Sequence, residues 1–365
     1  MAAESIDYAR PFRDAVWFDI LSRAAAHPEL PATVLLHAGP PFRGAPPAPV
    51  QNAAIQALLF EGLAPDAAAA RDLLLRGDVE LRPAQDHGMV TPLAQVVSGS
   101  MLLVAVRQRD QLCHAPIIEG AAPALRFGSA DPECRRRLRD AAVWIGASLA
   151  PSLRREPLRL DELIRAAIAA GEECHAATGA ANAAMISGLH GLDPQCAARL
   201  HACPAFVLPI LMAGAGAALR THRCGVEAIG GNGVDFGVRR RGAAAWSQMP
   251  AQPPRGVRFA GLDGAVPLAA IGDSAVIDFC GLGGQALPAA PSLAADWRAV
   301  LPDDALTRRH GLIDPSSGIV DPARIVRDAV PPLINLAVLD REGAAGLIGR
   351  GVYAPPVGLF AAVPR

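Results

Sequence analysis

The sequence contains no lysine, so all 34 of its basic residues are arginines. Aromatic residues make up only 4% of the chain, and the formal net charge is −1. A chain without excess positive charge has no general attraction for nucleic acid or for an anionic membrane surface, so we expect neither as a partner. Arginine does favour the bidentate capture of small carboxylates and phosphates, and we expect a small anionic substrate.

The chain also lacks a secretory core and a long hydrophobic run. Its longest apolar segment, residues 205–219, contains Pro209 and two glycines. A membrane-spanning helix needs roughly 20 apolar residues, so we interpret this segment as a buried helix. The seven cysteines are scattered and odd in number. That pattern favours free thiols in a reducing cytoplasm, and we expect a cytoplasmic protein.

Hydrophobic residues make up 51% of the 365 positions, which is enough for more than one compact core. Apolar periodicity predicts helices at residues 15–21, 50–61, 65–76, 131–187, 204–220, 281–290 and 322–330. Short apolar runs between glycine and proline predict strands at residues 33–37, 79–82, 226–229, 234–240, 257–259, 275–279, 334–339 and 353–360. This order predicts an α+β fold with two mixed α/β domains, residues 1–130 and 223–365, and a helical domain, residues 131–222, between them.

Two candidate sites lie in the N-terminal part of the chain. His37 ends a predicted strand, where it either lines a pocket or is an ordinary loop histidine beside a proline pair. Asp86 and His87 precede a glycine, and an adjacent carboxylate and imidazole suit proton transfer or metal binding. Neighbours on an extended chain point to opposite sides, however, so these two need not act together.

Glu119 and Arg126 flank a short connection that ends at Phe127. Arg126 is a candidate clamp for a carboxylate or phosphoryl group, although surface arginines without such a role are more common. We take both residues as candidate substrate-binding residues.

The segment Glu172-Glu173-Cys174-His175 is predicted to lie on a helix, where Glu172 and His175 would share a face. Glu-x-x-His spacing occurs in carboxylate-bridged metal sites, but those need a second copy that this sequence lacks, so we expect an acid/base pair and no metal. Asn182 would extend the polar face as a substrate-binding residue. Cys174 is more typical of a buried thiol than of a nucleophile.

Two glycine-rich segments, GGNGVDFGVR at residues 230–239 and IGDSAVIDFCGLGGQAL at residues 271–287, complete the candidate sites. Glycine lets backbone N–H groups approach a small anion closely, although turn formation is the alternative role and neither segment matches a nucleotide-binding fingerprint. Candidate substrate-binding residues in these segments are Asn232, Arg239, Asp273, Gly283 and Gly284.

These segments together resemble a bacterial family that includes a subunit of oxamate carbamoyltransferase, an enzyme of anaerobic allantoin breakdown and thus of nitrogen metabolism. The matching segments, in family order, are HAGPPF, DHGMVTPLAQVVSGSM, IIEGAAPALRFG, GEECHAATGAANAAM, CPAFVLPILMAGAGAA, GNGVDFGVR and IGDSAVIDFCGLGG. The resemblance implies transfer of a carbamoyl group from oxalurate to phosphate, giving oxamate and carbamoyl phosphate, without a cofactor. It also implies other subunits, including one that resembles acyl-CoA synthetase subunits, and we expect a homo-oligomer.

Such a transfer needs clamps for two acidic substrates and hydrogen-bond donors for an oxyanion. Arg126, Arg239 and the glycine N–H groups are suitable clamps, and His87 or His175 is a suitable proton carrier. The chain departs from the family pattern at Gln85, where a basic or polar residue, often histidine, is usual. A paralogue with a different carbamoyl or amide substrate is therefore an alternative.

Two further hypotheses belong to other functional classes. A non-catalytic scaffold or substrate-binding subunit would show a large apolar surface around the central helices and an uncharged pocket. A metal-dependent amidohydrolase would require Asp86, His87 and the Glu172/His175 pair to converge on a metal ion.

Overall fold

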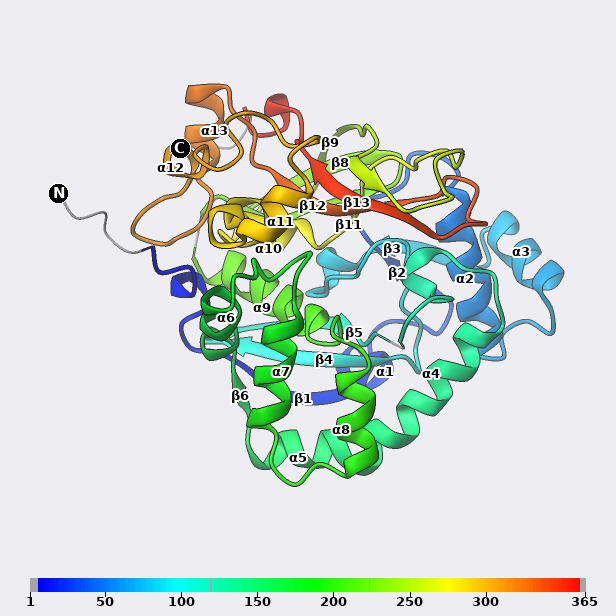
Figure 1. Ribbon diagram of the computed structural model, residues 1–365. Coiled ribbons are helices and arrows are strands. Elements are labelled where there is room, and N and C mark those ends of the chain that lie inside the picture. The colour runs from blue at the N-terminus through cyan, green and yellow to red at the C-terminus, as the bar shows by residue number, and fades with distance from the viewer. Residues whose placement is uncertain (1–5, 119, 223, 362–365) are drawn as a thin grey trace.

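The computed structural model describes residues 6–118, 120–222 and 224–361, which form an α+β fold of small sheets and surrounding helices (Figure 1). Its strands are β1 (Ala15–Ser22), β2 (Val34–His37), β3 (Glu80–Pro83), β4 (Leu102–Gln108), β5 (Gln111–Pro116), β6 (Leu158–Arg159), β7 (Val226–Asn232), β8 (Asp235–Arg240), β9 (Ser247–Pro250), β10 (Arg255–Arg258), β11 (Ile271–Gly272), β12 (Ile334–Leu339) and β13 (Leu347–Tyr353). Its α-helices are α1 (Arg23–Ala26), α2 (Ala48–Phe60), α3 (Ala67–Arg76), α4 (Glu133–Trp144), α5 (Ala150–Arg155), α6 (Leu160–Ala169), α7 (Gly179–Gly188), α8 (Pro194–His201), α9 (Leu208–Thr221), α10 (Ala275–Phe279), α11 (Pro291–Asp296), α12 (Arg309–Leu312) and α13 (Pro322–Asp328).

The strands of the described residues pair into antiparallel sheets of order β5-β4-β1-β6, β10-β13-β12 and β11-β7-β8-β9, and into the parallel pair β2-β3. Helix α9 lies between the first of these sheets and the C-terminal strands (Figure 1), in contact with β4, β5, β7 and α10. The largest hydrophobic cluster forms around it and includes Trp17, Leu211 and Phe279. This cluster therefore contains residues from each of the three predicted domains. The division into three domains stays a prediction.

Helix α9 is buried along its length because its neighbours approach it closely. Residues 209–219 are all buried. A Cβ atom at Gly214 would lie 2.1 Å from Cδ2 of Leu160, and one at Gly216 would lie 2.6 Å from Sγ of Cys113. The predicted buried helix is confirmed, and among the described residues no helix has the length and apolar character that crossing a membrane requires.

Most predicted elements with clear periodicity are confirmed, within a few residues, by α2, α3, α9, α13, β2, β3, β7, β8, β10 and β12. The predicted helix at residues 15–21 is wrong, because this segment is strand β1, paired on one side with β4 and on the other with β6. Its bulky Trp17, Phe18 and Ile20 suit an extended, packed chain better than a helix.

Four further predictions about elements are wrong in the C-terminal and central parts. Residues 275–279 form helix α10 and not a strand; the helix is buried on all sides and so short that its apolar run carries no helical period. Residues 281–290 contain two short 3₁₀ turns, and strand β13 ends at Tyr353 where a strand was predicted to begin. The long central helix is broken at residues 170–178, where Gly171 and Cys174 have positive φ.

The close approach of strands β7 and β11 gives a testable prediction. A Cβ atom at Gly231 would lie 2.2 Å from the carbonyl oxygen of Ala270, whereas one at Gly44 would have nothing within 4 Å. We expect Gly231→Ala to lower the free energy of unfolding by roughly 1–3 kcal/mol, the usual cost of overpacking. Gly44→Ala is the control and should leave it unchanged. Urea unfolding measures both, and equal stability of the two variants would contradict the packing described.

Candidate functional site

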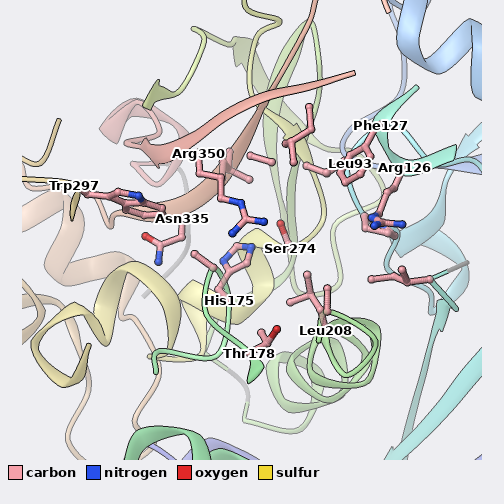
Figure 2. A pocket seen from close by; sticks show the side chains of 17 residues that line it. Leu93, Arg126, Phe127, His175, Thr178, Leu208, Ser274, Trp297, Asn335 and Arg350 are labelled. Carbon is pink, nitrogen blue, oxygen red and sulfur yellow. The ribbon is translucent and has the colours of Figure 1, made fainter. Parts of the chain in front are cut away.

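A cavity of about 140 Å³ lies where the N-terminal, central and C-terminal parts of the chain meet (Figure 2). Its polar lining residues are Arg126, His175, Thr178, Ser274, Asn335 and Arg350, and its larger apolar ones are Leu93, Ile118, Phe127, Leu208, Leu336, Leu347 and Trp297. Small-molecule sites have this character, with apolar walls and a few convergent polar groups. Two arginines and a histidine in so small a space favour an anionic ligand.

His175 is the central polar group of this cavity. Its Nδ1 lies 2.8 Å from Oδ2 of Asp278, and both side chains are buried. Among the described residues no hydrogen bond engages Nε2, and the imidazole lines the cavity. An imidazole whose Nδ1 donates to a carboxylate presents Nε2 as an acceptor when neutral and as a donor when protonated. This geometry allows His175 to exchange a proton with a ligand in the cavity.

The electrostatic surroundings favour the protonated form of His175. Burial lowers its pKa, but the charge and hydrogen bond of Asp278, together with the charge of Glu173, outweigh that effect. The pKa of His175 therefore lies above its ordinary value. A protonated imidazole can donate a proton, and it adds a positive charge to those of Arg126 and Arg350.

The carboxylate of Asp278 is held by backbone groups. Its Oδ1 accepts hydrogen bonds from the N–H of Gly284, at 2.7 Å, and from the N–H of Asn335, at 2.9 Å. A Cβ atom at Gly283 would lie 2.1 Å from that same oxygen, and one at Gly284 would lie 2.3 Å from the carbonyl oxygen of Leu333. The N–H of Gly284 thus binds a carboxylate of the protein itself, while the N–H of Gly283 donates to the carbonyl oxygen of Glu173, at 2.8 Å. Both predicted glycines therefore help to position the His175–Asp278 pair.

The turn that carries His175 is fixed by two glutamates. Glu173 accepts from the N–H groups of Ala176, at 2.6 Å, and Ala177, at 2.9 Å, and from Nδ2 of Asn335, at 2.6 Å. Oε2 of Glu172 accepts from the N–H of Ala180, at 2.7 Å, in the first turn of α7. The prediction that Glu172 and His175 share a helix face is therefore wrong, because the segment is a turn. The carboxylate paired with His175 is Asp278, which the sequence did not indicate.

Two residues of the site have a strained backbone. Leu93, which lines the cavity, has a φ of 50°, and Cys174, which precedes His175, has a φ of 69°. Residues other than glycine rarely adopt this left-handed conformation, and such strain clusters at functional sites. The strain independently supports this cavity as the functional site.

The two arginines of the cavity differ in their surroundings. Nη2 of Arg126 donates to the carbonyl oxygen of Gly120, at 2.6 Å, and its Cζ lies 4.3 Å from the centre of the Phe127 ring. Arg350, from β13, points toward His175 and Ser274 (Figure 2). Among the described residues no ion pair or hydrogen bond engages the Arg350 guanidinium. The sequence analysis identifies Arg126 but not Arg350. The sequence feature that could have indicated Arg350 is a charged residue within an otherwise apolar strand.

Asp86, His87 and Arg239 lie together outside this cavity. Oδ1 of Asp86 accepts from Nη1 of Arg239, at 2.5 Å, and from Nε1 of Trp246, at 2.8 Å. Burial lowers the pKa of His87. None of these three residues lines the cavity that holds His175. Among the described residues no group of three or more His, Cys, Asp or Glu side chains is placed to hold a metal ion, so the convergence that the amidohydrolase hypothesis requires is not found.

A second buried carboxylate, Asp273, ties N-terminal loops to the site. It accepts from the N–H groups of Gly39, at 2.8 Å, and Thr91, at 2.9 Å, and from Nε2 of Gln85, at 2.5 Å. Burial raises its pKa to about 7 in spite of these donors. Asp273 does not line the cavity, but the next residue, Ser274, does.

The other predicted binding residues make contacts within the fold. Nδ1 of His37 lies 2.8 Å from the carbonyl oxygen of Ala38, and burial lowers the pKa of this imidazole to about 4. Nδ2 of Asn182 donates to the carbonyl oxygen of Leu200, which joins α7 to α8. Oδ1 of Asn232 accepts from two backbone N–H groups in the turn between β7 and β8. Glu119 lies outside the described residues.

The contact between His175 and Asp278 gives a prediction about proton affinity. Asp278→Asn keeps an oxygen that can accept from Gly284 and Asn335 but removes the negative charge beside His175. We expect the pKa of His175 to fall, because the charge that raises it is lost. A ¹³C-histidine NMR titration, with the signal assigned from His175→Gln, measures this. Asp66→Asn, at the start of α3, is the control; an unchanged His175 pKa in Asp278→Asn would contradict the pairing.

A family model and one relative of this chain carry the same description. The family model described as oxamate carbamoyltransferase subunit AllG matches residues 79–274. The oxamate carbamoyltransferase subunit AllG of Escherichia coli strain K12 is 29% identical over 98% of this chain and 94% of its own length. The uncharacterised protein YahG of the same strain is 27% identical over 91% of this chain and 78% of its own.

The fold has a solved counterpart. The crystal structure of a conserved protein of unknown function from Enterococcus faecalis V583 superposes with a TM-score of 0.83 and 25% identity, covering 97% of this chain and 95% of that one. The matched family region, residues 79–274, contains Arg126, His175 and Ser274 of the cavity. The chain belongs to the oxamate carbamoyltransferase subunit AllG family.

Proposed function

We propose that this chain is a subunit of a carbamoyl-transferring enzyme and that the cavity around His175 is its reaction site, with oxalurate and phosphate as substrates and oxamate and carbamoyl phosphate as products. The observation that carries the proposal is the His175–Asp278 pair facing a small cavity together with Arg126 and Arg350. Membership of the family supports the reaction class.

The charges of the cavity suit these substrates. Oxalurate carries a carboxylate and phosphate is a dianion near neutral pH, so two anions must be held close to each other. Arg126, Arg350 and the imidazole of His175 supply positive charge from three separate elements. A planar guanidinium binds carboxylate and phosphate through paired hydrogen bonds, and this fixes orientation as well as charge.

The reaction needs one proton to move from phosphate to nitrogen. An oxygen of hydrogen phosphate attacks the ureido carbonyl carbon of oxalurate, and the bond from that carbon to the nitrogen of the oxamate part breaks. The departing nitrogen takes up a proton, which Nε2 of His175 donates, and the imidazole recovers a proton from the attacking phosphate. The products are the carbamoyl phosphate dianion and the oxamate anion, so charge and protons balance. Asp278 orients His175 and stabilises its protonated form.

The carbonyl oxygen becomes negatively charged as the phosphate adds. Arg350 and the hydroxyl of Ser274 lie in the same cavity as His175 and are donors of the kind that stabilise such an oxyanion (Figure 2). The apolar walls lower the local dielectric and strengthen these interactions.

We also propose that the chain works with other subunits, since its relative of 29% identity is named as a subunit. One of these subunits is expected to resemble acyl-CoA synthetase subunits. A non-catalytic role predicts an uncharged pocket, and the arginines of this cavity favour a chain that binds the substrate itself. Self-association is a separate expectation.

Product formation by the assembled enzyme tests the proposal. The complex of this chain with its partner subunits should form carbamoyl phosphate from oxalurate and phosphate. His175→Ala should lower the rate by roughly 100-fold or more, the usual contribution of a general acid. Arg350→Ala should raise KM for the anionic substrates, because it removes a charge that binds them. Arg327→Ala, at an exposed arginine paired with Asp328, is the control.

Two outcomes would contradict different parts of the proposal. Wild-type activity of both His175→Ala and Arg350→Ala in an assembled complex would place the reaction elsewhere. No product from a verified wild-type complex would remove the oxalurate reaction and leave a paralogue with another substrate.

A further inference from the structure

A second cavity, of about 270 Å³, lies between the N-terminal segment and the segment around α12, which are neighbours in Figure 1. It is lined by Tyr8, Arg10, Arg309 and His310, among other residues. None of its lining residues belongs to the cavity around His175. The candidate reaction does not use it, and its excess of basic side chains requires an explanation.

Arg309 is the buried cation of this cavity. Arg309 is only 6% exposed, and its Nε donates to the carbonyl oxygen of Gln285, at 2.7 Å. Its Cζ lies 4.6 Å from the centre of the Tyr8 ring. Among the described residues no carboxylate pairs with it, and no hydrogen bond engages its Nη atoms. A buried charge is costly unless it is paired, so this side chain favours an anionic partner in the cavity.

The remaining charges of the cavity do not neutralise Arg309. The lining carboxylate is that of Asp7, whose Oδ2 accepts from Nη2 of Arg13, at 2.9 Å. Arg10 adds a second guanidinium, anchored through Nη1 to the carbonyl oxygen of Pro315. The excess of positive charge in this cavity therefore favours a negatively charged ligand. The paired N–H groups of each guanidinium suit a planar or tetrahedral oxyanion.

We propose that this cavity is a second anion-binding site, which holds a small oxyanion, either a phosphate or a carboxylate, on Arg309 and Arg10. Binding there pairs the buried charge of Arg309. The site lies apart from the residues to which the carbamoyl-transfer proposal assigns roles, and it does not depend on that proposal.

The second site adjoins the turn that organises the first. Arg309 donates to the carbonyl oxygen of Gln285, and the preceding residue, Gly284, donates its N–H to Asp278. Gly281, at the start of the same turn, lines the second cavity. The two cavities therefore adjoin one turn, in which Gly281 lines the second cavity and Gly284 donates to Asp278.

Anion binding is measured in a background in which the first site is disabled. In His175→Ala/Arg350→Ala, isothermal titration with inorganic phosphate and, separately, with oxalate should still show binding at one site. The anion that binds more tightly identifies the ligand class. Adding Arg309→Gln should weaken this binding by about tenfold or more, as expected for loss of charged hydrogen bonds. Arg10→Ala should weaken it by a smaller factor. Arg76→Gln, at an exposed arginine of α3 that pairs with Asp78 and lines neither cavity, is the control.

Circular dichroism and urea unfolding check that each variant is folded, and Arg10→Ala keeps the test decisive if Arg309→Gln does not fold. Binding of neither anion in the double-variant background would overturn the proposal, as would binding that neither Arg309→Gln nor Arg10→Ala alters. These titrations measure binding without turnover, so failure of the carbamoyl-transfer assay leaves their result unaffected.

Discussion

The contact between the buried carboxylate of Asp278 and the imidazole of His175 is the interaction on which the site depends. It joins a turn of the central part of the chain to helix α10, and the second carboxylate oxygen joins α10 to Gly284 and to β12 through Asn335. A buried pair of this kind is tolerated only where further hydrogen bonds satisfy its remaining lone pairs. Here two backbone N–H groups do so, and the absence of side chains at Gly283 and Gly284 lets them approach.

The segment 273–279, which includes helix α10, carries two buried carboxylates that bring parts of the chain together. Asp273 lies just before its start and binds the N–H groups of Gly39 and Thr91, and Asp278 lies within it and binds His175. Ser274, between these anchors, faces the cavity. The cavity thus lies beside one short segment whose two carboxylates each bind a different part of the chain. Its arginines come from other elements, Arg350 from strand β13 and Arg126 from a short 3₁₀ turn.

The sequence predicts secondary-structure elements and candidate residue types better than it predicts which side chains contact each other. Helices α2, α3 and α9 and the strands around the glycine-rich segments were predictable because periodicity and turn residues are local signals. His175 was recognised as an acid/base candidate, but its partner was assigned to Glu172 on the assumption of a continuous helix. Asp278 lies 103 residues further along the chain, in a segment predicted as a strand. Local sequence patterns cannot indicate a contact between residues so far apart. Arg350 was missed for the same reason, since only the register of β13 turns it toward His175.

The most direct test of the account is a crystal structure of the assembled complex grown with oxamate and phosphate. The account predicts an anion bound by the guanidinium of Arg350 and within hydrogen-bond distance of Nε2 of His175, with the contact between His175 and Asp278 intact. Ligand density beside Asp86 and Arg239, or only in a partner subunit, with the cavity around His175 empty of ligand, would contradict it.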